Sequence, residues 1–243
     1  MGPTRIIFRR ELGHYFRSPI GWIIAAAVLL IDGILFEALA LGGSTEKLSA
    51  QVLEQFFYWG TGIPMFCGIL LSFRLLAEER QNHSMILLNT SPVRDVHIVL
   101  GKFFAALTFM ALIIAISIYM PLLIKVNGKI TWSQIFVGYF GMLLYGAAVL
   151  AIGIFASALT RQQIIAALVG ALILAVMHLV WQLARIVDSP LKEVFQQLDI
   201  WWVHYQNGFM RSVLNLKDVI YYVAVTYFFL LVAVKTLEAK RWQ

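Results

Sequence analysis

Residues 132–186 decide the fold, and they read WSQIFVGYFGMLLYGAAVLAIGIFASALTRQQIIAALVGALILAVMHLVWQLARI. The stretch holds two apolar runs, 132–159 and 163–186, and each is long enough for the ~20 residues that a helix needs to cross a bilayer. Only three residues, 160–162, separate the runs, so they are predicted to form a tight helical hairpin. Helices are favoured because spanning backbone must satisfy its own hydrogen bonds, and the alternating pattern of a β-barrel is not visible.

Four further runs of this kind occur at 20–41, 56–77, 96–124 and 219–237. The chain is 60% hydrophobic and 13% charged, whereas a soluble domain carries about 25% charged residues. Polar stretches stay under ~30 residues, which is too short for a second, independent core. The sequence therefore predicts an all-α fold: one polytopic bundle of six transmembrane helices over residues 20–243.

The distribution of basic residues predicts the orientation of this bundle, because cytoplasmic loops carry an excess of Lys and Arg. Of the 19 Lys and Arg, twelve fall on one side and seven on the other if the N-terminus is placed inside. Both termini are thus predicted to be cytoplasmic, in the cytoplasmic (inner) membrane of a bacterium. The net charge of +6 follows from this loop placement, and no basic stripe with interleaved aromatic residues suggests nucleic acid.

Residues 1–19 are predicted to form an amphipathic helix at the cytoplasmic surface. Apolar side chains recur at helical spacing, and basic ones, Arg9 and Arg10 among them, lie beside them. A basic amphipathic helix lies in the plane of the lipid headgroups. Ser18 and Pro19 then supply an N-cap and a first-turn proline for the first span. The alternative is that these basic residues only orient the first span.

A charged and partly apolar segment, 78–95, separates the second and third runs. It suggests a short helix at the membrane surface that is presented to a partner, with a few apolar anchors inside a polar rim. The candidate interface residues in it are Glu78, Glu79, Arg80, Met85, Ile86, Leu87, Leu88 and Pro92.

Two polar residues lie inside apolar runs, Asp32 and His178. Counting ~1.5 Å per residue puts both near mid-depth, so they are expected to form a pair. Intramembrane ionisable groups are functional candidates. The alternatives are a structural hydrogen bond, or a protonated Asp32 that faces a wet cavity.

The outer segment 188–216 is unusually aromatic. It is predicted to form short helices at the outer leaflet that bury Trp201, Trp202 and Tyr205 and close the outer side of a seam between two chains. An ordinary aromatic belt at the membrane interface is the alternative.

The sequence offers no chemistry of its own. Gly101-Lys102 lacks the upstream Gly and the following hydroxyl residue of a Walker phosphate loop, and the five His and the single Cys are scattered. Catalytic, cofactor-binding and metal-binding residues are therefore not expected in this chain.

Several short stretches carry a resemblance to a known family: RSPIG at 17–21, EER at 78–80, ILLNTSPV at 86–93, GKF at 101–103, DVIYY at 218–222 and LEAKRW at 237–242. With six spans, the chain resembles the permease subunit of a type-2 ABC exporter. Within that group it is similar to the GldF permeases associated with gliding motility.

The resemblance implies several partners. The helix at 1–19 and a coupling helix within 78–95 would contact a separate cytoplasmic ATPase, which binds ATP and Mg²⁺. A second permease chain, most simply another copy in a homodimer, and a periplasmic auxiliary protein are also implied, besides membrane lipids. Two other hypotheses remain at this point: a membrane anchor for a periplasmic complex, or an intramembrane enzyme that uses Asp32 and His178.

Overall fold

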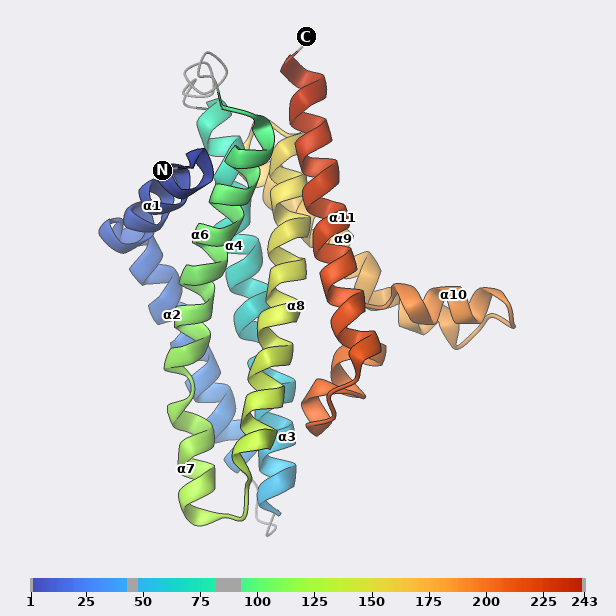
Figure 1. The fold of residues 1–243 in the computed structure, drawn as a ribbon. Helices are drawn as coiled ribbons and strands as arrows, with labels where there is room; N and C mark the ends of the chain where they lie inside the picture. Colours follow the sequence, from blue (N-terminus) through green and yellow to red (C-terminus); the bar gives the residue numbers. More distant parts are fainter. Residues whose placement is uncertain (1, 43–47, 82–92, 242–243) are drawn as a thin grey trace.

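The computed structural model describes residues 2–42, 48–81 and 93–241 of the chain. Throughout these residues the ordered elements are helices, without a strand, and six helical segments are long and apolar enough to cross a membrane. The predicted all-α polytopic bundle is confirmed (Figure 1).

The elements follow one another as α1 (Pro3–Arg17), α2 (Pro19–Leu35), the π-helical turn η1 (Phe36–Leu41), α3 (Ser49–Gly60), α4 (Gly62–Gln81), α6 (Asp95–Ile116), α7 (Tyr119–Asn127), α8 (Trp132–Leu159), α9 (Gln163–Ala184), α10 (Leu191–Leu198), the π-helical turn η2 (Trp202–Gln206), the 3₁₀ turn η3 (Phe209–Arg211) and α11 (Leu216–Arg241).

Two of the spans are broken helices and are longer than the apolar runs predict. The second span covers Ser49–Gln81, with a break at Thr61 between α3 and α4, where the Thr61 hydroxyl donates to the Tyr58 carbonyl (2.8 Å). The third covers Asp95–Val126 and breaks at Ser117, whose hydroxyl bonds to the Ile114 carbonyl (2.8 Å). Such a side chain offers the helix carbonyl an alternative donor, which bends or interrupts the helix.

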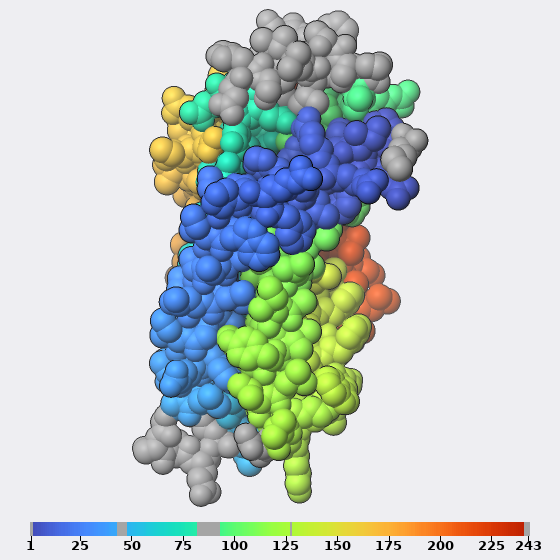
Figure 2. Space-filling view, turned by 90° about the vertical axis from the view of Figure 1, so that its left-hand side faces the viewer, coloured from blue at the N-terminus to red at the C-terminus, as the bar shows by residue number. Residues whose placement is uncertain are grey.

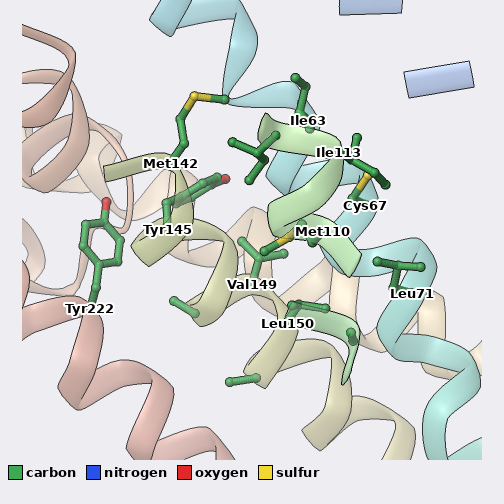
Figure 3. Packing of buried hydrophobic residues seen from close by; sticks show 14 of the residues in the cluster. Ile63, Cys67, Leu71, Met110, Ile113, Met142, Tyr145, Val149, Leu150 and Tyr222 are labelled. Carbon is green, nitrogen blue, oxygen red and sulfur yellow. The ribbon is translucent and has the colours of Figure 1, made fainter. Parts of the chain in front are cut away.

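Helix α8 is the centre of the bundle and packs against α4, α6, α9 and α11. Glycines let neighbours approach closely: a Cβ at Gly153 would overlap the Ser72 side chain of α4, and one at Gly138 would overlap the Phe57 ring of α3. Figure 3 shows the core between these helices. The side chains labelled there from α4, α6, α8 and α11 include Cys67, Met110, Tyr145, Val149 and Tyr222.

Both chain ends lie at the same end of the bundle (Figure 1), which we call the termini end. Helix α1 lies across α2 and α6 there, as Figure 2 shows from the side. At the other end the chain turns between α7 and α8 (Figure 1). Helix α10 projects sideways from the bundle beside α9, between the two ends (Figure 1). Helix α1, the amphipathic helix before the first span, therefore lies against the bundle and is part of the fold.

Candidate functional site

Four charged side chains from three helices meet at the termini end and form what we call the charged cluster: Arg10 and Glu11 of α1, Glu79 of α4 and Lys102 of α6. The Lys102 ammonium lies 2.9 Å from Glu79 Oε1 and 3.1 Å from Glu11 Oε1. Arg10 Nη2 contacts the same two oxygens at 3.1 and 2.8 Å. Each positive group thus faces both carboxylates, and the cluster is neutral overall.

The cluster is buried on its inner side. The Lys102 side chain is 2% exposed, the two glutamates are 14% exposed, and Arg10 on the outer side is 55% exposed. A buried Lys needs a charged partner, because desolvating a lone ion is very costly. Burial acts to raise the pKa of the Glu11 carboxyl, but Lys102 and Arg10 outweigh it, so the pKa lies below its ordinary value. Glu11 is therefore ionised at neutral pH.

A close contact between α1 and α6 brings Lys102 to this place. Ile7 of α1 packs at Gly101, where a Cβ would meet the Ile7 side chain and the Thr4 carbonyl. One turn away, Thr4 Oγ1 and His97 Nδ1 are 2.9 Å apart. The residues GK at 101–102, which fail as a phosphate loop, thus have a structural role: the glycine admits α1 and the lysine binds its glutamate.

The last turn of α4 is also tied to the end of α8. Arg80 Nη1 donates to the carbonyls of Ala158 (2.6 Å) and Thr160 (3.4 Å). Lys240 of α11 donates to the carbonyls of Ala158 and Leu159 (3.0 and 2.8 Å). The last carbonyls of a helix lack partners within it and carry partial negative charge. Two cations from two helices therefore cap α8.

The predicted interface residues are distributed over several helices. Glu78 pairs with Arg74 one turn back in α4 (2.9 Å), and Arg9 is exposed on α1. Helix α4 continues to Gln81, and α6 begins at Asp95. Residues 78–80, where the expected coupling segment begins, thus form the last turn of α4, and their charged side chains have partners within the bundle. Their contact with an ATPase stays a prediction. Five of the predicted residues lie outside the described residues: Met85, Ile86, Leu87, Leu88 and Pro92.

Two members of the cluster are not predicted by the sequence reasoning, Glu11 and Lys102. A signal for each exists. Glu11 is the only acid among the first 31 residues, and Lys102 lies inside an otherwise apolar run. Buried charges are usually paired, so these two isolated and opposite charges, Glu11 and Lys102, indicate an ion pair.

The expected pair of Asp32 and His178 does not form. Asp32 is buried on α2, which packs against α1, α3 and α4, and its Oδ2 has no hydrogen-bond partner among the described residues. His178 lies on α9, which packs against α8, α4 and α10. Its ring nitrogens face the Tyr145 hydroxyl (3.4 Å) and the Leu174 carbonyl (3.1 Å). Asp32 and His178 are expected from the sequence to pair because both lie near mid-depth in the membrane. They are not neighbours, because α2 and α9 lie on different sides of the bundle.

The outer segment forms one short helix, α10, in which no residue is buried, followed by the turns η2 and η3, which pack into the bundle. Trp201 and Tyr205 are buried, and Trp202 is half-buried. The Trp201 indole donates to Thr61 Oγ1 (3.3 Å), at the break in the second span. Asp199 Oδ2 accepts from the backbone N–H groups of residues 201 and 203 (3.1 and 2.8 Å). Burial raises the pKa of the Asp199 carboxyl to about 6, although these N–H groups act to lower it.

In the part of the chain that the structure describes, His, Cys, Asp and Glu do not gather in any group of three that could hold a metal ion. No curated protein matches this sequence. A family model described as ABC-2 family transporter protein matches residues 5–237, which include all six spans, α1 and the charged cluster. The chain therefore belongs to the ABC-2 transporter family and is a membrane permease subunit of an ABC transporter.

Proposed function

We propose that the charged cluster is where this permease receives the movement of its partner ATPase and distributes it among the spans. The observation that carries the proposal is that Lys102 and Arg10 each contact a glutamate of α1 and a glutamate of α4. Residues 82–94 connect α4 to α6, and each of these two helices contributes one residue to the cluster, Glu79 and Lys102. A force applied there would be transmitted to α1, α4 and α6 together.

From α4 the movement would pass to the centre of the bundle. Ser157 of α8 accepts hydrogen bonds from the backbone N–H groups of Leu76 (3.1 Å) and Ala77 (2.9 Å), and it donates to the Phe73 carbonyl (2.9 Å). Arg80 adds its bonds to the end of α8. Packed helices joined in this way move as rigid bodies, and their displacement appears at an interface between subunits.

The termini end would then face the cytoplasm, in line with the excess of basic residues on that side. In this proposal the ATPase docks on residues 82–94 and α1, and it binds ATP and Mg²⁺, while this chain stays non-catalytic. The apolar anchors in the docking segment are Met85, Ile86, Leu87 and Leu88.

The complete unit is proposed to contain two copies of this permease and two ATPases in the bacterial cytoplasmic membrane. It would drive export, or transmit force to an auxiliary protein on the outer side, as the resemblance to the gliding-motility permeases implies. The outer segment would close the outer side of the seam between the copies. Its anchoring of Trp201 at the break between α3 and α4 supports this role, because a movement of α4 would reach it directly.

The test uses the permease co-purified with its partner ABC ATPase and reconstituted in nanodiscs. Replacing Leu87 and Leu88 with Asp should release the ATPase while the permease still inserts. Lys102→Met should keep the ATPase bound but lower the ATP hydrolysis that the permease stimulates. Lys235→Met is the control, because it removes an exposed ion pair of α11. Full binding and stimulation in the Leu87/Leu88 double variant would overturn the docking site.

A further inference from the structure

A cavity of about 790 Å³ lies between α1, α2 and α4, with Lys102 of α6 in its lining. The charged cluster forms one of its walls, and residues 9–18 form its roof. Because α1 precedes the first span and lies across the bundle, we expect the cavity at the level where lipid headgroups meet the protein.

The lining of the cavity carries excess positive charge. Five lining residues are Arg or Lys and three are Glu. All three glutamates form ion pairs, Glu11 and Glu79 within the charged cluster and Glu78 with Arg74. Arg9 and Arg17 form no ion pair with any described residue, and both are exposed at the cavity. Two positive charges are therefore available to an anion.

The part of the cavity that is formed by the spans α2 and α4 is apolar. It is lined by Ile20 and Ile24 of α2 and by Leu70 and Leu71 of α4. Ile20 and Leu70 are exposed as well, and Ile23, one residue before Ile24, is an exposed member of the same span. The cavity thus continues onto the lipid-facing surface between α2 and α4. A ligand that fits both parts has an anionic head and an alkyl chain.

We propose that this cavity binds an anionic phospholipid. Its phosphate would contact Arg9 and Arg17, and an acyl chain would lie along Ile20, Ile24 and Leu70. Basic pockets on the cytoplasmic side of membrane proteins bind anionic headgroups in this way. An anionic lipid is preferred over a zwitterionic one, because a choline group would bring a third cation beside the two arginines. The inference depends on the membrane level of α1, and it is tested on the permease without the ATPase, so its failure is distinct from a failure of the coupling role.

The test is native mass spectrometry of the full-length permease, released from detergent after incubation with dioleoyl phosphatidylglycerol or dioleoyl phosphatidylcholine. We expect retention of phosphatidylglycerol over phosphatidylcholine. The double variant R9Q/R17Q should bind phosphatidylglycerol more weakly, on the order of tenfold. The matched control is R5Q/R94Q, which removes two exposed arginines of the termini end that do not line the cavity.

Three results would overturn the proposal. Equal retention of both lipids would exclude charge recognition. An equal loss in R5Q/R94Q and R9Q/R17Q would show a general surface attraction in place of a site. Displacement of phosphatidylglycerol by millimolar inorganic phosphate would show that the arginines bind free phosphate and that the acyl chain adds nothing. A second variant, Ile24→Trp, fills the apolar part and should weaken lipid binding while both arginines remain.

Discussion

Replacing Lys102 with Met tests whether the charged cluster holds α1 against the bundle. The change removes the only cluster cation that is buried, at 2% exposed, and leaves Glu11 and Glu79 facing each other across its site. Removing one partner of a buried ion pair costs about 3–5 kcal/mol. Arg10 still contacts both carboxylates, so the lower value, about 3 kcal/mol, is expected.

The loss can be read from thermal unfolding in detergent by fluorescence-detected size-exclusion chromatography. For a chain of this size, about 3 kcal/mol corresponds to a fall in Tm of about 6–12 °C. The control Lys235→Met breaks an exposed pair with Glu238, which is worth about 0–1 kcal/mol, so its Tm should fall by less than about 4 °C. Adding E11Q and E79Q to K102M should restore most of the lost Tm, because the uncompensated charges are then gone. A K102M protein no less stable than K235M would refute the reasoning.

Three further predictions concern the helix contact, the outer turn and the topology. Ser157→Ala removes the oxygen that accepts from two backbone N–H groups of α4, so a loss of about 1–3 kcal/mol is expected in the same unfolding assay, with no loss if water replaces the hydroxyl. Asp199→Asn should raise Tm at pH 7.5 and leave it unchanged at pH 4. The raised pKa of Asp199, about 6, means that the wild-type protein loses stability as pH rises from the ordinary pKa of 3.8 through 6. A Tm difference between variant and wild type that is constant with pH would contradict this. In a background where the buried Cys67 is replaced by Ala, a cysteine at Lys129 should react with an impermeant thiol reagent in intact spheroplasts and one at Arg94 only after lysis; labelling at Arg94 from outside would reverse the topology.

The apolar pattern predicts some elements to the residue and misses others for a physical reason. It gives α8 as 132–159 because polar residues mark both ends, with Thr131 and Gln134 forming a capping box at the start. It does not predict the breaks at Thr61 and Ser117. Hydropathy averages over a window, whereas each break depends on one hydroxyl that bonds to its own helix.

The candidate site is predicted in part. Sequence reasoning selects Arg10 and Glu79 as residues that face an ATPase, which stays a prediction, and the structure shows that they contact each other in the charged cluster. It omits Lys102 and Glu11, and it pairs Asp32 with His178. A count of residues gives the depth of a side chain in the membrane but not the order of the helices around the bundle. That order comes from contacts such as Ile7 against Gly101, which periodicity does not report.

The contact between α1 and α6 has a consequence for biosynthesis. His97, the partner of Thr4, lies 93 residues later in the chain, and Lys102 lies 91 residues after Glu11. Helix α1 is therefore translated first but reaches its final position only after two spans have been made and the third has begun. Until then Glu11 and Glu79 lack the Lys102 ammonium that contacts both of them in the folded protein. A nascent chain arrested while residue 102 is still inside the ribosome should keep α1 accessible to protease, and a longer chain that has released residue 102 should protect it.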